Sequence, residues 1–213
     1  MRLRNIKNAN QKLLETKYFV EEPTKYKGNF KKLFNNENEI HVEIGMGKGD
    51  FILGMAKKYP NINFIGIERF DTVLLKASKK IDQYELDNLK LIRFDATYIE
   101  DLFEKEIDHL YLNFSDPWPK NRHEHRRLTS DRFLKKYENI FKKDILITQK
   151  TDNQGLFEFS LMSYSKFGFE VDEISLDLYK TDLKDNVQTE YERKFSEKGD
   201  RIYKIKVSKV YKD

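Results

Sequence analysis

Acidic residues stand at the ends of three consecutive apolar segments of the chain. The segments read EIHVEIG, NINFIGIE and NLKLIRFD, and the acids in question are Glu43, Glu68 and Asp95. Short apolar segments separated by helical patterns predict parallel strands. In an open α/β sheet the carboxyl ends of such strands form the edge where ligands bind. One acid alone is as readily a helix cap or a turn residue, but three at matching strand ends predict one carboxylate-lined pocket.

A glycine loop follows the first of these strands. VEIGMGKGDF places Gly45 and Gly47 between a strand and a helix, where glycine permits a tight turn and lets the backbone approach a ligand closely. Alone this motif is weak. A nicotinamide dinucleotide would set its pyrophosphate on the N-terminus of the helix, but the carboxylates of Glu43 and Asp50 would repel it. The third glycine also comes one residue early for GxGxxG.

A cationic ligand suits these acids better than a phosphorylated one. S-adenosylmethionine carries a positive amino group and a sulfonium, together with a ribose diol and an adenine amine. Glu68 would accept hydrogen bonds from the ribose hydroxyls, Asp95 would meet the adenine amine, and Glu43 would lie near the methionine end. The sequence therefore predicts an S-adenosylmethionine pocket at this edge of the sheet.

A stiff acidic corner follows the fourth predicted strand, IDHLYLNFSD. Asp116 is expected to close this strand, and the prolines on both sides of Trp118 restrict the backbone there. The tryptophan offers a flat face for stacking, although a turn around a core tryptophan is the alternative. A dense basic run comes next, and such clustering beside a pocket suits phosphates, whereas most charge runs are solvated faces. Its basic residues are Lys120, Arg122, His123, Arg126 and Arg127.

The composition narrows the class of protein. The 213 residues fit one domain of ordinary size, or one domain with an extension. The chain has no cysteine, which excludes disulfides, thiolate metal sites and a cysteine nucleophile. Net charge is only +4, so the placement of charge matters more than its sum. No apolar run approaches the length of a membrane span and no signal-peptide core is visible, so the cytoplasm is the expected location.

Strands and helices alternate along most of the chain. Helices are expected near 129–141 and 153–166, with a fifth strand, DILITQ, between them. This alternation predicts parallel βαβ units in a doubly wound α/β sheet. The last two strands lack a strong intervening helix and are expected to form an antiparallel pair at the sheet edge. Residues 1–20 are basic, and they are either a solvated terminus or an arm that lies on a polyanion.

Four motifs in order give the chain a resemblance to a known family. VEIGMGKGDF, SDPWPK with its RHEHRR run, QKTDN and TEYERKF are similar to motifs of the bacterial tRNA (guanine-N7-)-methyltransferases. The resemblance implies a Rossmann-like class I methyltransferase fold, with a mostly parallel seven-stranded sheet, an antiparallel edge strand and helices on both faces. It implies methyl transfer from S-adenosylmethionine to a guanine at position 46, in the tRNA variable loop. The family often has lysine where this chain has His125, which bears on the charge at one RNA contact.

The resemblance also implies a role for individual residues. Asp116 would be the catalytic residue, and the cofactor site would consist of Glu43, Gly45, Gly47, Glu68, Asp95 and Asp116. The substrate would be contacted by Lys120, Asp152, Thr189, Tyr191 and Glu192, and the RNA by Arg122, His123, Arg126 and Arg127. Residues 1–35 would form a basic N-terminal extension and 36–213 the methyltransferase domain. The partner would be tRNA, with no membrane and no metal requirement, and the chain would be a monomer or a homodimer.

The chemistry of guanine N7 fits a site with no evident nucleophile–base pair. N7 has an in-plane lone pair and no proton, so it can attack the sulfonium methyl group in line without a general base, and catalysis then rests on positioning and electrostatics. Asp116 is expected to accept hydrogen bonds from guanine N1–H and the exocyclic amine, a task that Asp152 can share. The pattern T-x-x-E at 189–192 also predicts a helix capping box.

Other functions stay open on the residues alone. SDPWP is a near relative of the DPPY and NPPY motifs, which favours methylation of an exocyclic base amine as an alternative. An RNA-binding module with a dead cofactor pocket is a second, and the intact set of four acids speaks against it. A protein substrate would be an acidic one, given the basic rim. N7 of a paired guanine lies in the deep, narrow groove of A-form RNA, so the target is expected in an exposed or displaced loop.

Overall fold

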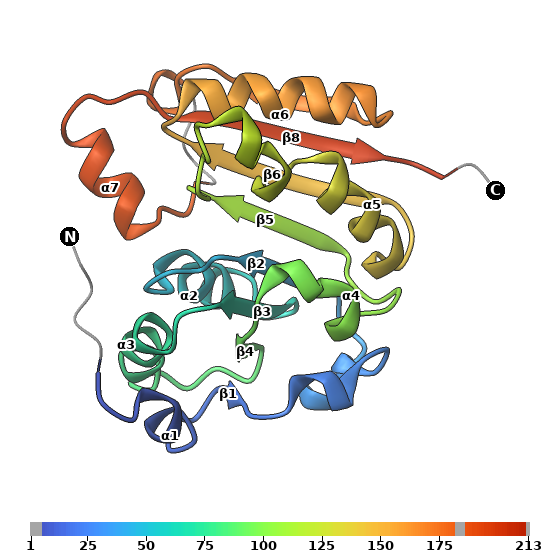
Figure 1. Cartoon of the computed structure of the whole chain (residues 1–213). Coiled ribbons are helices and arrows are strands. Elements are labelled where there is room, and N and C mark those ends of the chain that lie inside the picture. The colour runs from blue at the N-terminus through green and yellow to red at the C-terminus, as the bar shows by residue number, and fades with distance from the viewer. Residues whose placement is uncertain (1–5, 182–185, 212–213) are drawn as a thin grey trace.

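One mixed sheet forms the centre of the molecule (Figure 1). The computed structural model describes residues 6–181 and 186–211, and within them eight strands belong to this sheet. The strands are β1 (Phe19–Val20), β2 (Ile40–Ile44), β3 (Asn63–Glu68), β4 (Leu89–Arg93), β5 (His109–Asn113), β6 (Ile145–Thr151), β7 (Glu170–Ser175) and β8 (Tyr203–Lys209). Their order across the sheet is β1-β4-β3-β2-β5-β6-β8-β7.

The predicted α/β fold with a mostly parallel sheet is confirmed. Strands β1 to β6 run parallel, whereas β8 pairs antiparallel with both β6 and β7. The last two strands therefore form the expected antiparallel pair, with β7 outermost. The sheet has one strand more than the seven predicted, because Phe19 and Val20 pair with Leu91 and Ile92 of β4. Two residues carry too little apolar pattern for a strand to be predicted.

Helices cover both faces of the sheet, as predicted (Figure 1). The α-helices are α1 (Ala9–Leu13), α2 (Asp50–Lys58), α3 (Asp71–Ile81), α4 (Ile99–Leu102), α5 (Asp131–Ile140), α6 (Gln154–Lys166) and α7 (Glu190–Ser196). The 3-10 turns are η1 (Pro23–Tyr26), η2 (Phe30–Leu33), η3 (Ala96–Tyr98), η4 (Asn121–Arg126) and η5 (Leu178–Lys180). α5 and α6 confirm the two helices that were expected near 129–141 and 153–166.

Side-chain alternation along the strands divides the core into two clusters. Ile40, Val42 and Ile44 of β2 pack in the cluster that includes α4, α5 and α6. The opposite cluster buries Phe51 of α2 and Leu74 of α3. Because successive side chains of a strand point to opposite faces, the polar residues that alternate with the β2 isoleucines and valine face α2. The candidate site begins on that face.

Residues 6–35, which belong to the predicted basic extension, pack against the sheet. Leu13, Tyr18 and Phe30 are buried in the two core clusters. The backbone amide of Phe30 donates to Glu106 Oε2 at 2.9 Å. Residues 1–5, with the two most N-terminal arginines, lie outside the described residues. The division of the chain at residue 35 stays a prediction.

Candidate cofactor and substrate site

The central parallel strands bring five predicted site residues to one edge of the sheet. Glu43 lies in β2, and Glu68 is the last residue of β3. Asp95, Asp116 and Asp152 follow β4, β5 and β6. These strands are neighbours in the sheet order, so their carboxyl ends open on the same side. The structure thus gathers the acids as the strand-end pattern predicts.

Two of these acids lie slightly beyond the strands that were expected to end with them. β4 ends before Asp95 because this residue caps the next 3-10 turn, where its Oδ1 accepts a hydrogen bond from Thr97 N at 2.9 Å. β5 ends before Phe114, which has a φ of 51° and so leaves the extended conformation. Asp116 therefore stands on a loop that is free to face a substrate.

The glycine loop turns back on β3. Gly45 and Gly47 have φ values of 76° and 55°, a left-handed region that favours glycine. The amide of Gly45 donates to Ile67 O at 2.9 Å, and the amide of Gly47 donates to Glu68 Oε2 at 3.2 Å. The loop and the second acid of the site are thus held together before any ligand is present.

Asp50 opens α2, as expected, but its charge is balanced within the protein. Its carboxylate lies 2.7 Å from Lys80 Nζ and 3.1 Å from an Arg193 guanidinium nitrogen. Asp50 is therefore a poor source of repulsion for a pyrophosphate, contrary to the reasoning from sequence. The carboxylates that line the pocket are instead those of Glu43, Glu68 and Asp95.

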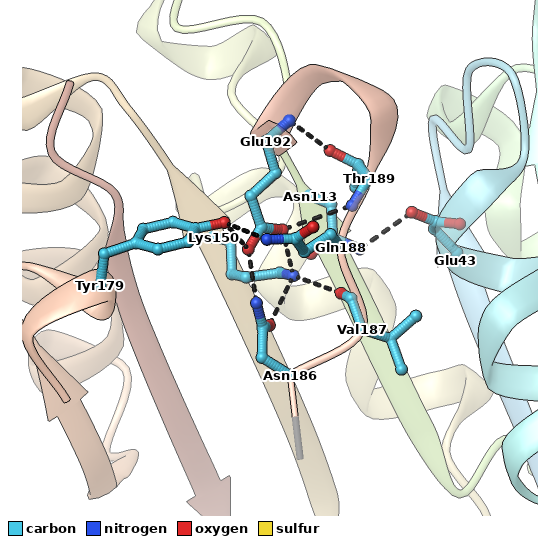
Figure 2. A network of polar contacts seen from close by, with 9 residues as sticks. All are labelled: Glu43, Asn113, Lys150, Tyr179, Asn186, Val187, Gln188, Thr189 and Glu192. Atoms are coloured by element: carbon cyan, nitrogen blue, oxygen red, sulfur yellow. Dashed lines mark hydrogen bonds and ion pairs between the residues drawn. The ribbon is translucent and has the colours of Figure 1, made fainter. Parts of the chain in front are cut away.

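Glu43 is the most deeply buried of the acids that the parallel strands bring to this edge. Its side chain accepts a hydrogen bond from Asn113 Nδ2 at 2.9 Å (Figure 2), while its Oε2 makes no hydrogen bond of ordinary geometry with any described residue. Burial raises the pKa of Glu43 to about 7. The hydrogen bond from Asn113, the charge of Lys150 and, more weakly, the backbone of Ile52 act against this rise. A buried oxygen without a partner is costly, so this position fits a cationic group of a ligand.

Glu68 and Asp95 line the other end of the same edge. Glu68 is 7% exposed and accepts a hydrogen bond from Phe70 N at 2.9 Å. Burial raises the pKa of Glu68, although backbone amides oppose the shift. Burial would also raise the pKa of Asp95, but hydrogen bonds from Thr97 and the nearby Arg69 outweigh it and leave the pKa below its usual value. Asp95 thus stays ionised and open to a hydrogen-bond donor.

Aromatic side chains beside these two acids were missed from sequence. Phe70 and Tyr98 follow Glu68 and Asp95 closely in the chain and are 55% and 60% exposed. Arg69 lies over the Phe70 ring, 4.6 Å from its centroid. Large exposed aromatic faces suit stacking on a flat ring. Their position directly after the strand-end acids was the signal that could have found them.

Arg127 holds the acidic corner in shape. Trp118 has a φ of 42°, which is strained for a bulky residue. Arg127 donates from Nε to Pro117 O and from Nη2 to Trp118 O, both at 3.0 Å. Its guanidinium also lies 4.2 Å from the ring centroid of Phe159. Although predicted as an RNA contact, Arg127 directs two of its five N–H donors at the backbone next to Asp116.

The rest of the basic run lies around the tryptophan. The guanidinium of Arg126 is 4.9 Å from the Trp118 ring, and His123 meets that ring edge-on at 5.8 Å. Lys120 and Arg122 are exposed. The tryptophan thus packs against its own basic segment, and the outer cations remain available to a polyanion.

Helix α7 carries the last group of predicted substrate residues. Thr189 Oγ1 accepts a hydrogen bond from Glu192 N at 2.8 Å, and the Glu192 carboxylate accepts one from Thr189 N at 3.4 Å, so the predicted capping box is confirmed. Tyr191 OH donates to Asp152 Oδ2 at 3.2 Å, and its ring lies 5.0 Å from that of Phe114. The helix therefore joins the ends of β5 and β6 in one site.

Comparison with known proteins identifies the family. A family model described as "Putative methyltransferase" matches residues 37–205. A tRNA (guanine-N(7)-)-methyltransferase of Oceanobacillus iheyensis is 50% identical over 210 residues, which cover 98% of this chain and 99% of that protein. The protein of the same name from Bacillus subtilis (strain 168) is 51% identical over 189 residues, or 88% of this chain and 89% of that one. This chain belongs to the bacterial tRNA (guanine-N7-)-methyltransferase family.

Solved structures with the same fold are methyltransferases as well. An antibiotic-related methyltransferase has a TM-score of 0.65 at 20% identity, covering 86% of this chain and 94% of that one. A SAM-dependent methyltransferase from Aquifex aeolicus has a TM-score of 0.57 at 12% identity, covering 95% and 99%. At these identities the likeness concerns the fold alone, and it confirms the Rossmann-like methyltransferase architecture of this family member.

Two histidines outside the site, His41 and His109, are buried beside polar side chains. His41 Nδ1 lies 3.2 Å from Tyr111 OH, and His109 Nε2 lies 2.9 Å from Thr148 Oγ1.

Across residues 6–181 and 186–211, no group of three or more histidine, aspartate or glutamate side chains is arranged to hold a metal ion. None of the described helices combines the length and the apolar character that a membrane span requires.

Proposed function

We propose that this chain transfers a methyl group from S-adenosylmethionine to N7 of a guanine in the variable loop of tRNA. The observation that carries the proposal is the shared sheet edge of the strand-end acids and helix α7, in a chain about half identical to proteins of that name. A tRNA substrate would place the activity in the cytoplasm. Whether the chain acts as a monomer or a homodimer stays a prediction.

The residues of the edge fit S-adenosylmethionine group by group. The unpartnered Oε2 of Glu43 would accept a hydrogen bond from the cationic amino group of the methionine end. Glu68 would bind the ribose hydroxyls and Asp95 the adenine amine, with Phe70 and Tyr98 flanking the base. When bound, the cofactor supplies an electrophilic methyl group on its sulfonium.

The chain's own part in the reaction is to orient guanine. Asp116 is exposed and pairs with no other described residue, so its carboxylate is free to accept hydrogen bonds from N1–H and the exocyclic amine. Asp152 can share this task, and Tyr191 holds it in place. Burial and the charge of Asp152 raise the pKa of Tyr191 to about 12, which keeps the phenol a neutral donor. N7 needs no general base, so orientation and charge are the contributions expected of the protein.

Nucleoside analysis tests the proposed function. Bulk tRNA lacking the modification is incubated with methyl-labelled S-adenosylmethionine and digested to nucleosides. The expected product is N7-methylguanosine, which carries a fixed positive charge. Label in an N2-methylguanosine or N6-methyladenosine peak would favour exocyclic amine methylation instead. Cofactor binding without any product would favour an RNA-binding module.

tRNA binding should weaken steeply with salt, because exposed cations beside Asp116 would replace counterions on phosphates. Arg122→Ala should lower the magnitude of the slope of log K against log salt concentration by about one. Lys143→Ala is the matched control and should leave the slope unchanged. Lys143 lies before β6, at the amino ends of the parallel strands and thus opposite the candidate site. A flat salt dependence of the wild type would contradict charge-based docking. Filter binding over a salt series measures all three.

Arg127→Lys should lower kcat by about 10- to 100-fold with little change in the KM for tRNA. Lysine keeps the charge but cannot donate to the carbonyls of Pro117 and Trp118 in the same forked geometry, so Asp116 loses its fixed position. Arg122→Ala, at an exposed cation, should instead raise KM and spare kcat. Steady-state kinetics on tRNA separate the two, and a pure KM effect at Arg127 would show a phosphate contact.

A further inference from the structure

A buried ion pair joins β6 to α7 and to the loop that precedes this helix. Lys150 Nζ lies 2.6 Å from Glu192 Oε2, and the two side chains are 3% and 0% exposed. The same ammonium donates to Val187 O at 2.9 Å and to Asn186 Oδ1 at 3.2 Å (Figure 2). Each of its three protons thus has an acceptor, which offsets the cost of removing the charge from water.

The carboxylate of Glu192 is fully used by the protein. Its Oε1 accepts from Asn186 Nδ2 at 2.6 Å and from Tyr179 OH at 3.2 Å (Figure 2). Its Oε2 accepts from Lys150 and, at 3.4 Å, from Thr189 N. A carboxylate offers about four acceptor positions, and these four donors take them. Glu192 is therefore built as an internal anchor, although the family resemblance implied a substrate contact.

The Glu192 anchor fixes side chains that lie at the carboxyl ends of the parallel strands, where the substrate is expected. Tyr191 is 43% exposed and reaches the carboxylate of Asp152. Thr189 is half-buried at the N-cap of the same helix. Both residues lie within one helical turn of Glu192, so a shift of the anchor would move them together.

The loop that precedes α7 also packs on α2, the helix that follows the glycine loop. A Cβ atom added to Gly54 of α2 would lie 2.5 Å from Val187 Cγ1, so the absence of a side chain there lets the segment pack directly on α2. Lys48 of the glycine loop pairs with Glu190 of α7. The position of α7 is thus defined against the cofactor side of the pocket as well as against β6.

From these contacts, and on the basis of the proposed function, we infer that Lys150 is a positioning residue for methyl transfer. Its buried ion pair with Glu192 sets where Thr189 and Tyr191 stand relative to the cofactor pocket. Lys150 itself does not contact the guanine, because its three protons are taken by the protein.

The test replaces both charges at once. Lys150→Met alone would leave Glu192 buried and uncompensated, which can prevent folding. The double variant Lys150→Met with Glu192→Met removes the pair without leaving a lone charge. The matched control is Lys136→Met with Glu100→Met, which removes a 2.7 Å ion pair between α5 and α4. Thermal unfolding and the emission of Trp118, the only tryptophan, check the fold and the acidic corner.

The double variant should bind S-adenosylmethionine within about 3-fold of the wild type and lose about 100-fold in kcat/KM for tRNA. The control variant should keep both values. A double variant with wild-type kcat/KM would overturn the inference, and so would a loss of cofactor affinity equal to the loss of turnover. Conversely, a wild type that makes no N7-methylguanosine would refute the proposed function. The role of Lys150 in holding α7 would then be tested by a measurement that does not depend on activity.

Hydrogen exchange supplies that second readout without any need for activity. The amides of α7 in the cofactor-saturated protein should exchange at least about 10-fold faster in the double variant than in the wild type or the control. Unchanged exchange of α7 would show that the ion pair does not hold the helix, whatever the activity of the protein.

Discussion

Asp116→Ala should lower kcat on tRNA by about 100- to 1,000-fold, the usual effect of removing one oriented polar group from a transition state. The carboxylate is exposed, follows β5 on the loop held by Arg127, and pairs with no described residue. It therefore has acceptor capacity for guanine N1–H and the exocyclic amine. It would also stabilise the positive charge that spreads over the base as N7 is methylated.

The discriminating measurement is single-turnover kinetics beside cofactor titration. The alanine variant should bind S-adenosylmethionine far better than its turnover suggests, because Glu43, Glu68 and Asp95 remain. Asp152→Ala is the matched comparison, and the ratio of the two rates divides the orienting task between the two acids. If cofactor affinity fell as far as the single-turnover rate in Asp116→Ala, the role of Asp116 would be in cofactor binding alone.

The sheet and the strand-end acids were predictable because their signals are local. Each strand and the acid at its end lie within about ten residues of sequence, and the geometry of parallel sheets gathers the strand ends. The capping box of Thr189 and Glu192 is local in the same sense. Where the signal was short, as in the two residues of β1, prediction failed.

The contacts that fix the site could not be predicted, because their partners are far apart in the chain. Nothing near Lys150 indicates that its charge is matched by Glu192, and a sequence shows Arg127 only as one cation in a run. Both side chains bind protein groups that tertiary packing brings to them. A basic residue beside a pocket thus has two uses, as a contact for phosphate or as a support for the backbone, and only the geometry distinguishes them.

Glu43→Gln should weaken S-adenosylmethionine binding by about 100-fold, because it removes the buried charge that would face the cationic end of the cofactor. The same change should stabilise the protein without cofactor at neutral pH and above. Burial raises the pKa of Glu43 from 4.5 to about 7. An acid with a raised pKa contributes stability that is complete below about pH 4.5 and is lost as pH rises through about 7.

The glutamine variant carries no such loss, so its advantage should grow over that window. The shift in pKa corresponds to about 3 kcal/mol in the free energy of unfolding. Thermal unfolding of both proteins should nearly coincide at about pH 4.5, and the variant should be clearly more stable at about pH 8. Equal stability of the two proteins across this range would show that Glu43 is not strained by its burial.

Cofactor binding should also release a proton from the wild type near pH 6, because a cationic ligand favours the ionised form of Glu43. Calorimetry in buffers with different ionisation enthalpies measures this release, and Glu43→Gln should abolish it. A release that persists in the variant would assign the proton to another group. Stability and affinity thus oppose each other at this residue: the oxygen without a partner that destabilises the protein alone is the one that would recognise the methyl donor.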